Sequence, residues 1–134
     1  MAFTSQHQSA RLTCPKDQGT MLHADARGVW VERCDCCGGI WLDCGELERL
    51  VKHKTAVKEV DAGSALSLKR FAIGAPGPRK CPRDGTVLTT MQHHEQKHIV
   101  IDRCSTCMGI FLDAGELKDI ADFTLSERIR AILV

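Results

Sequence analysis

The alternation of apolar and polar positions predicts two short β-hairpins at corresponding places in the chain. Segments 20–23 and 29–33 are rich in β-prone residues and flank Gly28, which predicts a hairpin between them. Segments 86–91 and 98–103 have the same character and predict a second hairpin with a longer polar loop. The chain therefore contains two similar β units separated by about sixty residues.

A helix start is predicted after each hairpin. Asp43 and Asp113 precede Glu46 and Glu116 by three residues, the spacing of a capping box with Asp at the N-cap. Leucines on either side of each Asp are placed for a hydrophobic staple. The apolar positions assigned to one side of the first helix are Leu47, Leu50, Val51, Val57 and Val60, and those of the second helix are Leu117, Ile120 and Ala121.

Glycine and proline divide the chain between the two units. Residues 61–80 include Gly63, Gly74, Pro76, Gly77 and Pro78, a composition typical of a linker. The predicted organisation is a first module with its helix at 11–60, a linker at 61–80, and a second module with C-terminal helices at 81–134. Each module is then a hairpin followed by a helix, which is a small α+β fold.

The two modules are copies of one sequence unit. Their first parts read Cys14-Pro15-Lys16-Asp17 and Cys81-Pro82-Arg83-Asp84. Their later parts read Arg33-Cys34-Asp35-Cys36-Cys37-Gly38-Gly39-Ile40-Trp41-Leu42-Asp43-Cys44-Gly45-Glu46-Leu47 and Arg103-Cys104-Ser105-Thr106-Cys107-Met108-Gly109-Ile110-Phe111-Leu112-Asp113-Ala114-Gly115-Glu116-Leu117. The same order of parts in both runs indicates a duplication.

Composition indicates that these small modules need a cross-link or a metal. Aromatic residues make up 4% of the 134 residues, Tyr is absent, and there are eight cysteines. The polar segment 1–10 does not read as a secretory signal, and no apolar run is long enough to span a membrane. The cysteines are therefore expected to be reduced, in the cytoplasm, and to bind metal rather than form disulfides.

Each copy supplies three cysteines and one aspartate with the spacing of a zinc site. Cys34 and Cys37, like Cys104 and Cys107, form a C-x-x-C knuckle, and the other arm holds one cysteine with an aspartate three residues later. Glycines beside these ligands are expected where the backbone turns tightly, at Gly85 and at Gly39 and Gly109. The sequence predicts two structural Zn²⁺ per chain, with ligands Cys14, Asp17, Cys34, Cys37, Cys81, Asp84, Cys104 and Cys107.

Several residues admit a second interpretation. Either aspartate can be a turn residue that bonds its own backbone, and the fourth ligand is then a histidine, His23 in the first copy and His93, His94 or His98 in the second. Cys36 and Cys44 have no counterparts in the second copy and are either incidental or a redox pair or alternative metal ligand. Trp41 and Phe111 are expected in the core, with exposed stacking aromatics as the alternative.

At these residues the sequence resembles the bacterial transcription-factor zinc-finger family, of the TFIIB type. The resemblance rests on the C-P-x-D starts, the C-x-x-C knuckles and the run Gly38-Gly39-Ile40-Trp41-Leu42-Asp43-Cys44-Gly45-Glu46-Leu47. It covers residues 14–50 and 81–120, with departures at Met108 and Phe111 and with Asp17 and Asp84 where a second cysteine is commoner. The resemblance implies two tandem zinc ribbons and suggests contacts with nucleic acid or the transcription machinery.

Charge favours a protein partner over nucleic acid. The net charge is +1, and only residues 54–80 are basic, with six basic and two acidic side chains that include Lys69-Arg70 and Arg79-Lys80. The expected function is a zinc-binding adaptor for another macromolecule. The alternatives are a nucleic-acid-binding regulator, and a metal-dependent hydrolase or thiol oxidoreductase. The candidate catalytic carboxylates are Asp43, Glu46, Asp113 and Glu116.

Self-association is expected from the C-terminal segment. As a helix, residues 125–134 place an apolar stripe along one side, formed by Leu125, Ile129, Ile132 and Leu133. Such a stripe needs cover, either from the first helix of the same chain or from a second chain in a symmetric dimer. A homodimer is therefore predicted.

Overall fold

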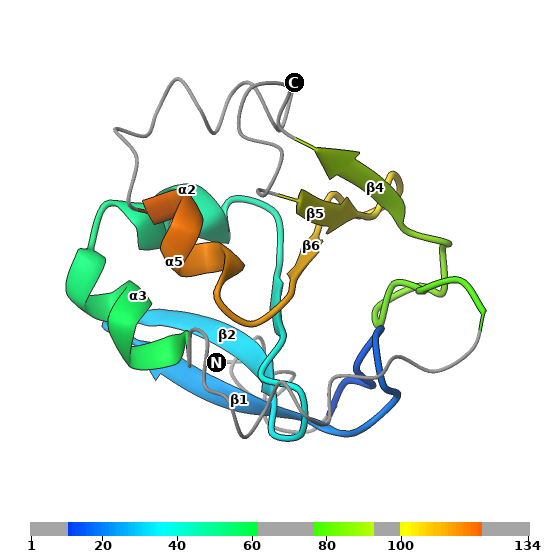
Figure 1. Cartoon of the computed structure of the whole chain (residues 1–134), viewed down its shortest axis with the longest axis horizontal. Coiled ribbons are helices and arrows are strands. Elements are labelled where there is room, and N and C mark those ends of the chain that lie inside the picture. Colours follow the sequence, from blue (N-terminus) through cyan, green and yellow to red (C-terminus); the bar gives the residue numbers. More distant parts are fainter. Residues whose placement is uncertain (1–10, 62–76, 93–99, 122–134) are drawn as a thin grey trace, which may run out of the picture.

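The computed structural model describes residues 11–61, 77–92 and 100–121. It has the element order of a duplicated α+β unit (Figure 1). The elements are β1 (Met21–Ala26), β2 (Val29–Cys34), β3 (Ile40–Leu42), α2 (Glu46–Val51), α3 (Lys54–Val60), β4 (Thr89–Gln92), β5 (Val100–Arg103), β6 (Ile110–Leu112) and α5 (Glu116–Ala121). The fold class predicted from the pattern is confirmed.

Both predicted hairpins form. In the first, β1 and β2 pair from Met21 opposite Cys34 to Ala26 opposite Val29, which leaves a loop of two residues. Both loop residues have positive φ, 54° at Arg27 and 91° at Gly28, as a type I′ turn requires. In the second hairpin, β4 pairs with β5 in antiparallel register.

The two copies share one sheet. Its six antiparallel strands follow the order β1-β2-β3-β6-β5-β4, so that the copies meet where β3 pairs with β6. In that pairing Trp41 lies opposite Phe111, and these two residues occupy the same repeat position. Antiparallel pairing of equivalent residues relates the copies by an approximate twofold axis between the two rings.

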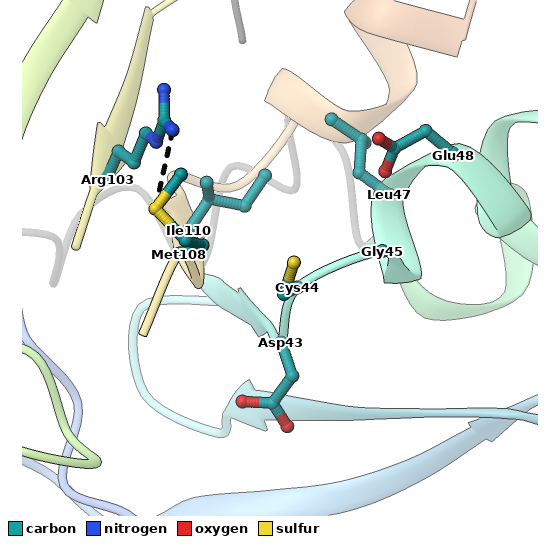
Figure 2. Close-up of a pocket in the computed structure, with 8 residues that line it drawn as sticks. All are labelled: Asp43, Cys44, Gly45, Leu47, Glu48, Arg103, Met108 and Ile110. Atoms are coloured by element: carbon teal, nitrogen blue, oxygen red, sulfur yellow. Dashed lines mark hydrogen bonds between the residues drawn. The ribbon is translucent and has the colours of Figure 1, made fainter. Parts of the chain in front are cut away.

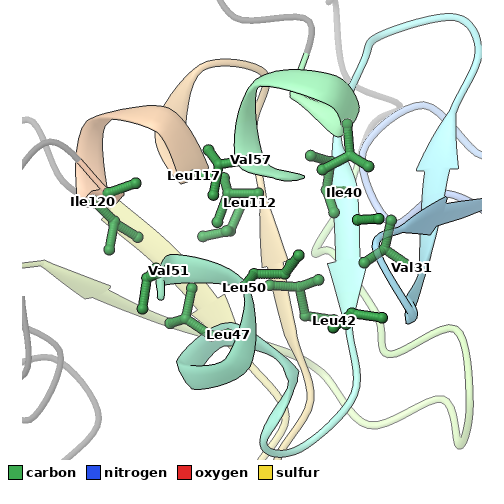
Figure 3. Close-up of a cluster of buried hydrophobic side chains, with 14 of the residues drawn as sticks. Val31, Ile40, Leu42, Leu47, Leu50, Val51, Val57, Leu112, Leu117 and Ile120 are labelled. Atoms are coloured by element: carbon green, nitrogen blue, oxygen red, sulfur yellow. The ribbon is translucent and has the colours of Figure 1, made fainter. Parts of the chain in front are cut away.

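One face of the sheet carries the helices and the larger apolar core. Helix α3 contacts β1 and α5, and α2 contacts β2 and both of the other helices. Figure 3 shows the side chains of the two copies meeting between the helices and the central strands. The fully buried members include Ile40, Leu42, Leu47, Leu50, Leu112, Leu117 and Ile120. Apolar burial on this face therefore contributes to joining the two copies.

Helix boundaries differ from the prediction in two ways. The apolar positions assigned to one first helix fall on α2 and α3, which are separated at Lys52 and His53. Glu46 does accept a hydrogen bond from the backbone N–H of Asp43 at 2.8 Å, the acceptor half of a capping box. However, α2 begins after Gly45, at φ 88°, and no side chain caps it, so Asp43 is not the N-cap.

Asp61, the first residue of the predicted linker, ties the first copy to the second. Its side chain is buried, and its two carboxylate oxygens accept the backbone N–H groups of Gly115 and Lys118, each at 2.8 Å. The carboxylate thus satisfies free N–H groups at the start of α5. The predicted boundaries at 61–80 and 81–134 remain a prediction, and much of both segments lies outside the described residues.

Candidate metal centres

The structure brings the eight predicted ligands together in two groups. Each group has three cysteines and one aspartate whose ligand atoms all lie within 4.8 Å of one another. Among the residues that the structure describes, the groups are Cys14, Asp17, Cys34 and Cys37, and Cys81, Asp84, Cys104 and Cys107. In each group one turn before the hairpin supplies a cysteine and the aspartate, and the knuckle after it supplies the other two cysteines.

Backbone turns fix these sulfur atoms. In the first centre, Cys14 donates its N–H to the carbonyl of Gly19 at 2.7 Å, and Cys34 donates to that of Gly39 at 2.8 Å. The turned residues then point their N–H groups at sulfur, as Lys16 does to Cys14 Sγ at 3.4 Å. The equivalent bond in the second centre joins the N–H of Arg83 to Cys81 Sγ at 3.3 Å. Such hydrogen bonds orient thiolate ligands and spread their charge.

The distances within each group fit a tetrahedral zinc ion. Zn–S bonds of about 2.3 Å and Zn–O bonds of about 2.0–2.2 Å at tetrahedral angles place two sulfurs about 3.8 Å apart, and sulfur about 3.5–3.7 Å from oxygen. The measured S···S distance is 3.7 Å in both groups, for Cys14 with Cys37 and for Cys81 with Cys107. The carboxylate oxygens lie 3.4–3.6 Å from the sulfur of Cys34 or Cys104. The chain has two structural Zn²⁺ sites.

Both interpretations of the aspartates hold in the same geometry. Asp17 Oδ1 accepts the backbone N–H of Gly19 at 2.8 Å, and Asp84 Oδ1 accepts that of Thr86 at 2.9 Å. Each carboxylate thus closes its own turn and also stands at the fourth corner of the cysteine group. The hydrogen bonds from Thr86 lower the pKa of Asp84, which keeps the carboxylate charged and able to bind a cation.

The first-copy histidine belongs to neither group. His23 Nδ1 lies 2.8 Å from Glu32 Oε2, and burial lowers the pKa of the imidazole. The other histidines considered as ligands, His93, His94 and His98, lie outside the described residues. The groups that the structure assembles therefore contain cysteine and aspartate alone.

Burial and hydrogen bonding shift the pKa values of different ligand cysteines in opposite directions. Desolvation raises the pKa of Cys81 to about 12, so this thiol needs the metal to replace its proton. In the first centre, the thiols of Cys14 and then Cys37 stabilise a thiolate at Cys34 and hold its pKa below the usual range. A negative charge is thus already favoured in the group before a cation binds.

A second core surrounds the two centres on the face opposite the helices. Trp41 and Phe111, both fully buried, lie in one cluster with the ligand cysteines of both copies. The prediction of core packing is confirmed for both, and an exposed stacking role is excluded. The metal centres and the apolar cluster thus form one continuous unit.

The knuckle glycines make room for the aromatic ring of the other copy. A Cβ on Gly39 would stand 2.3 Å from Phe111 Cζ, and one on Gly109 would stand 2.3 Å from Trp41 Cζ2. Positive φ occurs one residue earlier in each knuckle, 75° at Gly38 and 66° at Met108. The expectation of tight backbone at Gly39 and Gly109 is therefore wrong, whereas Gly85 does have a positive φ of 81°.

Ion pairs cross the boundary between copies in both directions. Arg83 of the second copy donates two hydrogen bonds to Asp43 of the first, at 3.1 and 2.8 Å. Lys16, at the position equivalent to Arg83, lies 3.2 Å from Asp113 Oδ1. In the sequence the only sign of these pairs is that both positions have the same charge in the two copies. They give each of the two aspartates a cationic partner in the opposite copy.

The remaining cysteines lie at separate places. All eight thiols are free, and Cys36 and Cys44 are both exposed. Cys44 lines a pocket between the start of α2 and the second knuckle, shown in Figure 2, which contains no other cysteine. The lining consists of Asp43, Cys44, Gly45, Leu47, Glu48, Arg103, Met108 and Ile110. Cys36 lies instead in the first knuckle, so the structure does not join the two as a redox pair.

No helix among the described residues is long and apolar enough to cross a membrane.

Comparison with known proteins supports the resemblance on both copies. Neither the curated proteins nor the solved structures compared with the chain include a match. The zinc-ribbon pattern described as transcription factor zinc-finger matches residues 13–53 and 80–122, which together are more than half of the chain. With two such matches and two metal centres, the chain belongs to the transcription factor zinc-finger family and holds two tandem copies of its zinc ribbon.

Proposed function

We propose that this chain is a zinc-stabilised adaptor that binds another protein in transcription or its regulation. The observation that carries the proposal is the pairing of the cations beside both centres. Lys16, Arg79 and Arg83 each contact an aspartate within 3.4 Å. Cations held by carboxylates are poor partners for phosphate, because a phosphate must displace the carboxylate first.

The donor sets argue against a catalytic metal. A catalytic zinc keeps one position for water, whereas three thiolates and a carboxylate fill all four positions of a tetrahedral ion. The candidate catalytic carboxylates also have structural partners. Glu46 and Glu116 accept the backbone N–H groups of Asp43 and Asp113 at 2.8 and 2.9 Å. We therefore assign the zinc ions to folding, and eight cysteines without a disulfide fit a reducing compartment such as the cytoplasm.

The strongest candidate for the contact surface is the first hairpin. Trp30 on β2 is 44% exposed, although it is one of the two tryptophans in the chain. Its ring meets that of His23 edge to face at 6.2 Å, which limits its freedom. Aromatic side chains that are held in place and half exposed are enriched at protein interfaces. The sequence pattern alone does not mark Trp30 as exposed, because aromatic residues in β-prone segments are often buried.

Affinity capture with purified, zinc-loaded protein tests this proposal. W30A should reduce recovery of the protein partner at least about tenfold, since central interface aromatics contribute about 2 kcal/mol or more. V87A, at a 51% exposed residue far from the hairpin in sequence, is the matched control and should recover the partner normally. Both variants must keep two zinc ions per chain.

An oligonucleotide titration against salt separates the nucleic-acid alternative. The chain should bind duplex and single-stranded oligonucleotides weakly at 0.15 M salt. Tight binding that falls steeply as salt rises would contradict the proposal, because that slope counts displaced counterions and hence phosphate contacts. In that case the basic segment 54–80, including Lys69 and Arg70, becomes the candidate interface.

A further inference from the structure

In each copy one cation extends from the turn that supplies two metal ligands to the opposite copy. These cations are Lys16 and Arg83, each of which lies between a ligand cysteine and a ligand aspartate in sequence. The backbone N–H of Lys16 points at Cys14 Sγ at 3.4 Å, and that of Arg83 points at Cys81 Sγ at 3.3 Å. One residue of each turn therefore contacts its own centre through its backbone and the opposite copy through its side chain.

The aspartates that receive these cations lie beside the central ring of the opposite copy. Lys16 Nζ lies 3.2 Å from Asp113 Oδ1, and Arg83 donates to the two oxygens of Asp43 at 3.1 and 2.8 Å. Asp43 Oδ1 also accepts the indole N–H of Trp41 at 3.0 Å. The Lys16 side chain is 15% exposed and that of Arg83 is 28% exposed. Both ion pairs are therefore partly removed from water, where charges attract each other more strongly than on an open surface.

The central rings make a second connection between each knuckle and the opposite copy. The ring of Phe111 packs against Gly39, whose backbone N–H points at Cys37 Sγ at 3.4 Å. The ring of Trp41 packs in the same way against Gly109 of the second knuckle. Both rings lie in one apolar cluster with the six ligand cysteines. Each metal centre thus contacts the opposite copy both at its turn and at its knuckle.

We propose that these contacts couple the two metal centres, so that a zinc ion at one centre raises the zinc affinity of the other. Zinc fixes the turn and the knuckle of its own centre, because each supplies two of the four ligands. Without zinc these two arms share no bond to a common ion, and the side chain of Lys16 or Arg83 loses more conformational freedom when it reaches its aspartate. The first ion therefore orders contacts that the opposite centre also uses, and the second ion binds a chain that is already ordered on that side.

The coupling gives the chain a steeper response to zinc than two separate ribbons would have. Because binding free energies are linked, each centre must raise the affinity of the other by the same factor. Chains with two ions and chains with none are therefore favoured over chains with one. This inference goes beyond the proposed function and does not depend on it, since metal loading needs no partner.

The zinc affinities of single-centre variants of the full chain measure the coupling. C107A leaves only the first centre complete and C37A only the second, and competition with a chromophoric chelator gives the zinc affinity of each. The two-ion binding constant of the wild-type chain should exceed the product of these two affinities at least about tenfold, which is a typical coupling between sites. Equality of the two quantities would overturn the proposal.

Removal of the two cations shows whether the ion pairs carry the coupling. K16Q/R83Q keeps every ligand and both backbone N–H groups but removes the pairs between copies, so the excess over the product should fall at least about threefold. The direct effect of each cation on its own centre cancels, because it enters both the two-ion constant and the product. R27Q is the matched control, since Arg27 pairs with Glu59 of its own copy at 3.3 Å, and it should keep the wild-type excess. An excess unchanged by K16Q/R83Q would contradict the role given to these cations.

Native mass spectrometry of the wild-type chain tests the coupling without any ligand substitution. When the chain holds one zinc ion on average, independent centres leave at least about half of the chains with a single ion, whatever the two affinities are. The coupled wild-type chain should show fewer single-ion chains than this, and K16Q/R83Q should show more than wild type. If C37A or C107A fails to fold, this distribution decides, and single-ion wild-type chains at half or more would overturn the proposal.

Discussion

Near its central aromatic ring the first copy has a buried apolar residue, whereas the second copy has a cation over the equivalent ring. Leu12 and Arg79 each lie two residues before the first cysteine of their copy. Leu12 is buried in the cluster that contains Trp41. The guanidinium of Arg79 lies 5.5 Å from the centre of the Phe111 ring, a cation–π contact.

The difference follows from whether each ring can donate a hydrogen bond. The indole N–H of Trp41 donates to Asp43 at 3.0 Å, and the other donor to this carboxylate is Arg83 of the opposite copy. A phenyl ring has no hydrogen-bond donor. Asp113 instead accepts a hydrogen bond from Arg79 of its own copy at 3.4 Å. The two copies can thus keep the same arrangement of buried rings, because the hydrogen bond that Phe111 cannot make is supplied by Arg79.

Zinc removal should have the largest effect and should begin at the second centre. Metal supplies up to about 10–16 kcal/mol of apparent folding free energy in zinc fingers. The second centre is more accessible, since Asp84 is exposed and Cys107 is half-buried, while Asp17 is half-buried and Cys37 is buried. A chelator should therefore release zinc in two phases, with loss of the sheet signal in circular dichroism after the second.

C107A, which removes a ligand of the second centre, shows which centre gives each phase of zinc release. This variant should lack the fast phase and keep the slow one. A circular dichroism spectrum and melting temperature unchanged by complete zinc removal would mean that the helical core holds the sheet alone. Simultaneous release of both ions would mean that exposure does not distinguish the centres.

Substitution of the knuckle glycines should break the contact between copies equally from either side. G39A and G109A each place a Cβ about 2.3 Å from a ring carbon of the other copy, so the ring or the strand has to move. A loss of about 3 kcal/mol in unfolding free energy is expected for each, at the upper end of overpacking effects. Denaturant titration of zinc-loaded protein measures it. G28A should lose less unfolding free energy, because a Cβ added to Gly28 meets no atom, although the residue has a positive φ.

Conversion of the second copy to the chemistry of the first sharpens the comparison. R79L removes the cation that bonds buried Asp102 at 2.7 Å and should lower stability by about 2 kcal/mol. F111W restores a donor for Asp113, so R79L/F111W should be more stable than the sum of the single changes predicts. Additive effects in a double-mutant cycle over R79L and F111W would show that the ring and the cation are independent.

The smallest expected effect is on the pH dependence of stability. Burial raises the pKa of Glu116 to about 8 and that of Glu46 to about 7, from ordinary values near 4.5. A raised carboxyl pKa contributes stability below the unfolded value, and that contribution is lost as pH rises through the folded value. The free energy of unfolding of E116Q relative to wild type should therefore rise by about 2 kcal/mol between pH 5 and pH 8.5, and that of E46Q should rise by less.

Denaturant titrations of wild type and variants at saturating zinc measure that gain. Proton release on zinc binding contributes equally to each protein and cancels in the difference. A difference between E116Q and wild type that stays constant across this pH range would mean that Glu116 titrates as an ordinary carboxylate.

The local structure of this protein could be predicted from its amino-acid sequence. The C-x-x-C knuckles, the duplicated unit, both hairpins and the buried apolar positions of the helices follow from residue types a few positions apart. Zinc-ligand spacing is local within each arm, and the two arms are joined by a hairpin whose register brings them together. The predicted C-terminal helix and the dimer that depends on it lie outside the described residues and stay predictions.

The way in which the two copies combine depends on tertiary contacts that no local pattern predicts. The pairing of β3 with β6, the ring of Trp41 over Gly109, and the Asp61 carboxylate at the start of α5 join residues about fifty to seventy positions apart. Short-range patterns carry no signal for such partners, because a glycine that makes room for a distant ring looks like a turn glycine, and an aspartate that caps a distant helix looks like a linker residue. Only closure of the shared sheet sets these groups at contact distance.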